Sequence, residues 1–168
     1  MIIGISGKMG SGKDTTAKLI QEILPTFTIV HFADILKEVC SSLFGISKFY
    51  FYGDKNYKVP NYDFTAREII QKVGTFVRQE FGEDFWIKRL FQEYNNEYII
   101  IADVRFLNEA NKIKELGGQL IRIERDDITQ CNHISETELD NYDKFDAIIY
   151  NNGSIKDLEV EIMNWLNG

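Results

Sequence analysis

The chain has 168 residues, of which 44% are hydrophobic, and a formal net charge of −7. This length suits one domain with a buried core, and the acidic balance argues against a broad nucleic-acid-binding surface. Two cysteines, Cys40 and Cys131, give no disulfide framework, and neither a charged leader nor an apolar run of membrane-spanning length is present, so we expect a cytoplasmic protein.

The first third of the chain alternates between strand and helix patterns. The predicted elements are a buried strand, an amphipathic helix, a second strand and a second helix, at 2–6, 13–24, 27–32 and 33–44. Residues 45–61 are aromatic and polar and contain Gly53 and Pro60, which predicts an irregular segment.

The alternation resumes after this segment. Helices are predicted at 64–81, 83–95, 106–116 and 154–166, and strands at 98–102, 119–123 and 147–150. Strands that alternate with helices favour an α/β fold with a parallel sheet covered on both faces. We expect one domain, 1–168, with a substrate-binding insertion at about 45–95 and a lid loop at about 126–142.

A glycine-rich segment connects the first strand to the first helix. Gly7 to Lys13 fits the pattern Gly-x-x-x-x-Gly-Lys, in which backbone N–H groups surround phosphate oxygens and the lysine reaches the terminal phosphates. The following helix directs its N-terminal dipole at the same anion. The segment therefore predicts a nucleoside triphosphate site at Gly7, Gly10, Ser11, Gly12 and Lys13.

Asp14 stands where this motif usually has a Ser or Thr that binds Mg²⁺. Its carboxylate could support the ion directly or through water, or the hydroxyl of Thr15 could take that role. Asp14 is equally explained as a first-turn acid that interacts favourably with the helix dipole.

Charged residues also follow the later strands, and carboxyl ends of parallel strands share one edge of a sheet. Asp103 is a candidate for Mg²⁺, or a turn-forming residue. Arg105 suits bidentate phosphate recognition, or a surface ion pair. Arg122 and Arg125 flank the end of the fourth strand, where Arg125 could approach the transferring phosphate, or both form an exposed basic strand end.

The region between the second and third strands holds the candidates for a phosphate acceptor. Lys37, Arg67 and Arg78 lie on predicted helices, where solvent-exposed charge is the alternative. Asp34 could bind a sugar hydroxyl or orient the attacking group, or cap a helix. Trp86 and the aromatic run 49–52 could stack on a base, or fill the core.

The two histidines, His31 and His133, form no metal-ligand spacing with the acidic residues. We expect His31 to be a hydrogen-bonded core residue of the second strand. His133 lies in the predicted lid loop near Glu136, where a hydrogen bond that orders the loop is the expected role.

Four segments together resemble the viral deoxynucleoside monophosphate kinases, in order and spacing along most of the chain. They are Gly12-Lys13-Asp14-Thr15-Thr16-Ala17, Gly74-Thr75 leading to Phe85-Trp86, Asp103-Val104-Arg105, and His133-Ile134-Ser135-Glu136. Asn151-Asn152-Gly153-Ser154 also resembles the end of that family, where P-loop kinases wrap the adenine of ATP. The segment 45–61 is the least similar.

The resemblance implies a three-layer P-loop kinase fold, with the first strand central in a five-stranded parallel sheet, and γ-phosphoryl transfer from ATP with Mg²⁺ to a deoxynucleoside 5′-monophosphate. In this family Asp14 is a regular feature, and it would hold the ion with Thr15 and Asp103. Arg105 and Arg78 would clamp the acceptor phosphate, and Arg125 would neutralise charge in the transition state. Thr16, Arg122 and Asn152 complete the expected nucleotide contacts.

Other small P-loop kinases remain alternatives, such as those for dephospho-coenzyme A or phosphomevalonate. A third alternative is a nucleotide-dependent switch without transfer activity, although no Asn-Lys-x-Asp guanine signature follows the fourth strand. We expect a nucleotide substrate and no nucleic-acid or membrane partner. The sequence does not decide between a monomer and a homodimer, between bases, or between ribose and deoxyribose.

Overall fold

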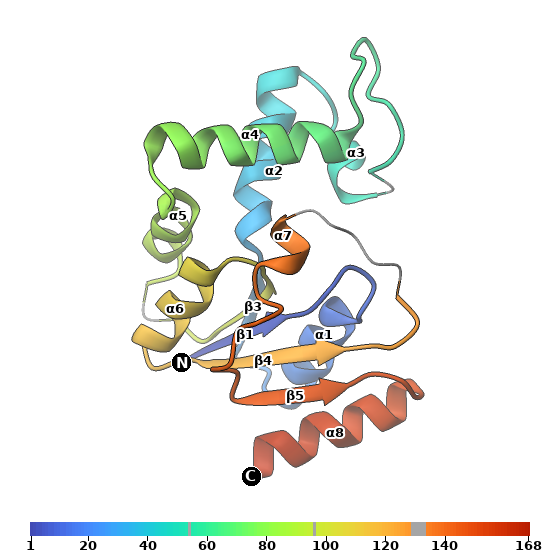
Figure 1. Ribbon diagram of the computed structural model, residues 1–168, viewed down its shortest axis with the longest axis vertical. Helices are drawn as coiled ribbons and strands as arrows, with labels where there is room; N and C mark the ends of the chain where they lie inside the picture. The colour runs from blue at the N-terminus through green and yellow to red at the C-terminus, as the bar shows by residue number, and fades with distance from the viewer. Residues whose placement is uncertain (54, 96, 129–133) are drawn as a thin grey trace. The chain divides into compact units, whose positions relative to one another are not determined.

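The computed structural model describes residues 1–53, 55–95, 97–128 and 134–168. They form two compact units, one of residues 1–31 and 94–168 and the other of residues 32–93, each of which is described by itself (Figure 1). The organisation expected from the sequence, one domain with an insertion at about 45–95 and a lid at about 126–142, stays a prediction.

A parallel sheet forms the centre of the first unit. Within the described residues it has five strands in the order β2-β3-β1-β4-β5, and every neighbouring pair is parallel. The strands are β1 (Ile2–Ser6), β2 (Thr28–Val30), β3 (Ile99–Val104), β4 (Gln119–Glu124) and β5 (Ala147–Tyr150). The first strand is central, as expected, and all five carboxyl ends lie at one edge, where ligands bind in such folds.

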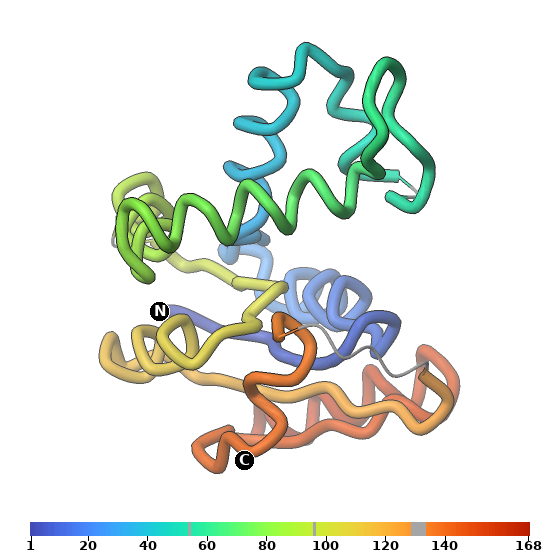
Figure 2. The backbone as a smooth tube through the Cα atoms, turned by 45° about the horizontal axis from the view of Figure 1, so that its top comes forward, coloured from blue at the N-terminus to red at the C-terminus, as the bar shows by residue number. Residues whose placement is uncertain are grey.

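Helices cover both faces of this sheet. Helices α1 (Lys13–Ile23) and α8 (Ile155–Asn167) share one apolar core with residues of four strands, among them Ile3, Ile100 and Ile121. A side chain at Gly4 would project from the opposite face and meet Ile113 of α6 (Leu107–Glu115), so α6 covers the other side (Figures 1 and 2). This arrangement is the three-layer α/β fold expected from the sequence.

The second unit is helical. Its elements are α2 (Phe32–Phe44), α3 (Phe49–Tyr52), α4 (Ala66–Phe81) and α5 (Phe85–Glu93). Thr65 and Glu68 form a reciprocal capping box at the start of α4, and a core of seven buried residues joins all four helices. The core residues are Leu36, Cys40, Phe51, Val59, Ala66, Ile69 and Trp86.

Two expectations about the strands need correction. His31 lies just after β2 and is partly exposed, so it is not a core residue of that strand. Asp103 is within β3, which continues to Val104, so the strand does not close at this residue. The third strand continues because Val104 pairs with Ser6 of β1, a contact between distant residues that the apolar pattern does not indicate.

Part of the predicted lid loop forms the one-turn helix α7 (Ile134–Thr137). The expected role of His133 lies outside the described residues, as does Cys131. In the part of the chain that is described, no helix has both the length and the apolar character needed to cross a membrane.

Candidate active site

The segment Gly7 to Gly12 connects β1 to α1 in a conformation that depends on its glycines. Gly12 has φ +101°, and a side chain there would clash with the amide of Asn151. Gly7 has φ +146°, and its Cβ would lie 2.5 Å from the carbonyl oxygen of Ile123. Because neither position accepts a side chain, the backbone forms the wall of this loop.

Ser11 gives the loop an unsatisfied polar group. Its Oγ is fully buried and has no hydrogen-bond partner among the described residues. A buried hydroxyl normally has a partner, because leaving it unpaired costs about 1–3 kcal/mol. A phosphate oxygen would be such a partner, so the loop fits the triphosphate that the sequence predicts.

Lys13 is buried at the first position of α1 and is the centre of the site. Its Nζ donates to the carbonyl oxygens of Gly7 at 2.6 Å and Lys8 at 2.7 Å. Burial lowers the pKa of Lys13 to about 8, helped by the positive charges of Arg105 and Arg122, while the carboxylates of Asp14 and Asp103 oppose the shift. Residues from three strand ends and α1 therefore act on one ammonium group.

The candidate metal ligands lie around the same helix terminus. Asp14 has a side chain that is 81% exposed and accepts a hydrogen bond from Nε2 of His31 at 3.2 Å. Thr16 donates its hydroxyl hydrogen to the carbonyl of Gly12 at 3.1 Å, so its predicted nucleotide contact would have to replace that bond. In the described ranges, no three acidic, His or Cys side chains form a ready-made metal cluster.

The structure gives Arg122 a different role from the predicted nucleotide contact. It is buried, its Nε pairs with Glu124, its Nη1 donates to the carbonyl of Leu139 at 3.1 Å, and its Nη2 donates to Asp140 at 2.8 Å. All three guanidinium nitrogens are thus engaged. Asp140 also pairs with Lys8 at 3.1 Å, so the buried Arg122 anchors the segment that follows α7 to the phosphate loop.

The end of β5 contributes a residue to which the sequence assigned no role of its own. Asn151 is buried, and its Nδ2 donates to the carbonyl of Ser11 at 2.8 Å, which fixes the loop from its outer side. Asn152, to which the adenine contact was assigned, is exposed and hydrogen-bonds to Asp126 instead. Arg125 is exposed after β4.

Arg105 directly follows β3 and contacts α7. Its Nη1 donates to the carbonyl of Ser135 at 3.2 Å and pairs with the carboxylate of Glu136. Glu136 belongs to the motif that carries the family resemblance, which was the only signal in the sequence for this contact.

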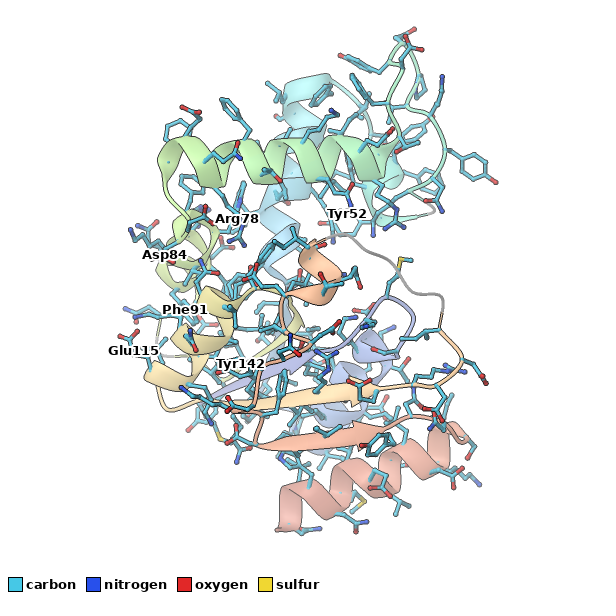
Figure 3. All side chains as sticks on the ribbon, viewed as in Figure 1. Tyr52, Arg78, Asp84, Phe91, Glu115 and Tyr142 are labelled. Carbon is cyan, nitrogen blue, oxygen red and sulfur yellow. The ribbon has the colours of Figure 1, made fainter. Side chains whose placement is uncertain are left out.

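In the second unit, the side chains of Asp34, Lys37 and Tyr52 lie close together. Lys37 Nζ lies 2.9 Å from Asp34 Oδ1 and 4.3 Å from the ring centre of Tyr52. Burial raises the pKa of Tyr52 to about 12, with a further contribution from the charge of Asp34 and the hydrogen bond to it. Asp34 and Lys37 are therefore partners, and Tyr52 (Figure 3) is the member of this cluster that the sequence did not single out.

The other predicted acceptor residues of this unit also have protein partners. Arg67 donates its Nε hydrogen to Asn56 at 3.1 Å. Arg78, near the end of α4 (Figure 3), is buried and donates to the carbonyl of Glu83 at 3.1 Å. Trp86 is 4% exposed, packs against Phe85 and donates to Gly74, so its ring belongs to the core of this unit, and its role in base stacking stays a prediction.

A glycine-rich loop with a buried lysine, at the carboxyl edge of a five-stranded parallel sheet, defines a P-loop nucleotide-binding protein. Solved structures with this fold cover nearly the whole chain. A dephospho-CoA kinase from Campylobacter jejuni matches with a TM-score of 0.55 and 15% identity, covering 99% of this chain and 95% of its own. A shikimate kinase from Aquifex aeolicus matches with a TM-score of 0.53 and 17% identity, covering 100% and 97%.

The sequence comparisons assign the family. The family model for deoxynucleotide monophosphate kinase matches residues 41–162. A protein of Acanthamoeba polyphaga mimivirus that carries a provisional name as a deoxynucleotide monophosphate kinase is 33% identical over 184 residues, covering 98% of this chain and 95% of the relative. The chain belongs to the deoxynucleotide monophosphate kinase family, and it is a nucleotide kinase.

Proposed function

We propose that this protein transfers the γ-phosphoryl group of ATP to a deoxynucleoside 5′-monophosphate, giving the diphosphate and ADP. Family membership supports a nucleotide kinase, and the deoxynucleoside acceptor is the finer proposal. The observation that carries the assignment of the site is the buried Lys13, whose Nζ donates to the carbonyls of Gly7 and Lys8 in the loop that holds the unpaired hydroxyl of Ser11.

The loop binds the donor. Lys13 exchanges its two carbonyl contacts for oxygens of the β- and γ-phosphates, and Ser11 offers its buried hydroxyl. An oxygen of the acceptor phosphate attacks the γ-phosphorus, and the bond from that phosphorus to the β–γ bridging oxygen breaks, so ADP leaves. Since the attacking oxygen already carries negative charge, the reaction needs positioning and charge neutralisation more than a general base.

The donor set fits magnesium. This ion is usually held by one or two carboxylates together with substrate phosphates and waters, and Asp14, Thr15 and Asp103 supply oxygen ligands of that kind. When bound, magnesium neutralises charge on the β- and γ-phosphates. Asp14 also accepts from His31, so its carboxylate is oriented before any ion arrives.

The first unit offers two arginines for the phosphates. Arg105 binds the acceptor phosphate at the sheet edge, and the exposed Arg125 approaches the transferring phosphoryl group. For the second unit, taken by itself, positions in the sequence and the family resemblance are what support Asp34, Lys37 and Arg78 as acceptor contacts.

The test is an ADP-release assay with the four common deoxynucleoside monophosphates, the matching ribonucleotides, dephospho-coenzyme A and phosphomevalonate. We expect turnover with at least one deoxynucleotide, and loss of turnover in Lys13→Ala. Turnover only with dephospho-coenzyme A or phosphomevalonate would identify a different P-loop kinase. ATP hydrolysis that no acceptor stimulates would indicate a nucleotide-dependent switch.

A further inference from the structure

Glu136 lies in α7 and joins the phosphate loop to Arg105. Its side chain is 8% exposed, which is low for a carboxylate. One oxygen accepts the backbone N–H of Met9 in the loop at 2.8 Å, and the other pairs with Nη1 of Arg105. A single carboxylate thus contacts both the donor-binding loop and an arginine assigned to the acceptor phosphate.

This contact fixes the orientation of Arg105. Nη1 is used twice by α7, once by Glu136 and once by the carbonyl of Ser135 at 3.2 Å. In the ranges that the structure describes, Nε and Nη2 of Arg105 meet no hydrogen-bond acceptor. The guanidinium is planar and rigid, so holding Nη1 leaves the Nε–Nη2 edge available for bidentate binding of a phosphate.

A neighbouring acid shows that this role is particular to Glu136. Glu138 lies two residues further on and accepts the backbone N–H of Leu107 at 2.7 Å, at the start of α6. Among the described residues, Glu138 has no hydrogen bond to Arg105 or to the loop. The two acids therefore stabilise the same short segment, and of the two it is Glu136 that contacts the loop and Arg105.

We propose that Glu136 is a positioning residue for phosphoryl transfer, which holds the Nε–Nη2 edge of Arg105 toward the acceptor phosphate at a fixed place relative to the loop. This inference rests on the proposed function, because it assumes that Arg105 binds the acceptor. It predicts that loss of Glu136 acts through Arg105, and that the affinity for ATP changes little.

A double-mutant cycle tests this dependence. Glu136→Gln is expected to lower kcat/KM for the acceptor by about tenfold, as the loss of a charge-assisted hydrogen bond suggests, with less than about a twofold change in the Kd for ATP. In an Arg105→Ala background the same substitution should change kcat/KM by less than about twofold. The matched control Glu138→Gln should leave kcat/KM near the wild-type value. Equal effects in both backgrounds, or an equal effect of Glu138→Gln, would overturn the proposal.

A second measurement needs no turnover and separates this inference from the proposed function. In NMR spectra of the protein without nucleotide, Glu136→Gln should shift the Met9 amide proton upfield and average the Arg105 Nη signals, while Glu138→Gln should leave both unchanged. If the wild-type protein phosphorylates no nucleotide, the proposed function fails, and the inference fails with it because no acceptor remains. If it does phosphorylate one and these signals do not respond to Glu136→Gln, the inference fails alone.

Discussion

Several charged residues of the first unit act on one buried group, Lys13, whereas the described contacts of the predicted acceptor residues in the second unit have different partners. In the first unit, Arg105, Asp103 and Asp14 all influence the same buried ammonium. In the second unit, Lys37 pairs with Asp34, Arg67 contacts Asn56 and Arg78 contacts Glu83. The donor site therefore has one central side chain, whereas these contacts of the acceptor residues have no common one.

This difference has a structural cause. The five parallel strands bring residues from distant parts of the chain to one edge, so a charge at any strand end joins the same site. A charge on a helix of the second unit has no such constraint, and its partner is set by its neighbours on that helix or loop. Substitutions of Lys13 and of the charged residues around it should consequently be coupled.

The largest expected effect is the removal of the central ammonium. Lys13→Ala should lower kcat/KM by about a thousandfold, the size of effect seen when a donor aimed at transition-state charge is lost. The control is Lys18→Ala, which removes an exposed lysine of the same helix and should keep near-wild-type turnover. The measurement is ADP release with the best deoxynucleotide acceptor. Retention of activity by Lys13→Ala would contradict the claim that the donor site of the first unit is centred on Lys13.

The next effect concerns stability. Trp86→Ala should lower the free energy of unfolding by about 3 kcal/mol, because it empties a buried position in the core of the second unit. Phe76→Ala, at an exposed position of α4, should cost less than about 0.5 kcal/mol. Denaturant unfolding followed by circular dichroism measures both. If the Trp86→Ala protein had normal stability and a raised KM for the acceptor, the result would support stacking of Trp86 on the acceptor base.

A smaller effect distinguishes two adjacent asparagines. Asn151→Ala should weaken ATP binding by about tenfold, since the loop loses the hydrogen bond from Asn151 to the Ser11 carbonyl. Asn152→Ala, whose partner is Asp126, should change the Kd for ATP much less. Titration calorimetry with a non-hydrolysable ATP analogue gives both values, and the reverse order would support the adenine contact expected at Asn152.

The smallest effect is the dependence of ATP affinity on pH. The pKa of Lys13 is lowered to about 8, and bound phosphates favour the charged form, so nucleotide binding should raise this pKa and take up protons. ATP affinity should therefore fall by about fivefold as the pH rises from about 7 to about 9. Lys13→Arg stays charged throughout this range and should bind ATP with a flatter pH profile. An equally steep profile for both proteins would assign the titration to another group.

The lowered pKa of Lys13 also makes the free energy of unfolding depend on pH. The folded state loses the Lys13 proton near pH 8, whereas the unfolded chain keeps it up to about 10.5. The cost of burying the ammonium is therefore present at neutral pH and is relieved as the pH rises between these values.

Much of the fold and the position of the phosphate loop could be predicted from the sequence. Apolar strands that alternate with amphipathic helices predicted the parallel sheet, and the glycine-lysine spacing predicted the loop, because both depend on local backbone requirements. The contacts of Asn151 with Ser11 and of Glu136 with Met9 join residues 140 and 127 positions apart, which no local pattern encodes. The burial of Trp86 and the ion pairs of Arg122 were hidden for a related reason: residue type shows that a side chain can bind a ligand, but not whether the core or an ion pair also holds it. Their roles in ligand binding stay predictions.

The most direct test of the central claim follows the phosphoryl group itself. The protein is incubated with ATP labelled at the γ-phosphate and one deoxynucleoside monophosphate at a time, and the products are separated. The account predicts label in a deoxynucleoside diphosphate in amounts equal to the ADP formed, and none in the Lys13→Ala reaction. Label that appears only in inorganic phosphate, at the same rate with and without acceptor, would contradict it.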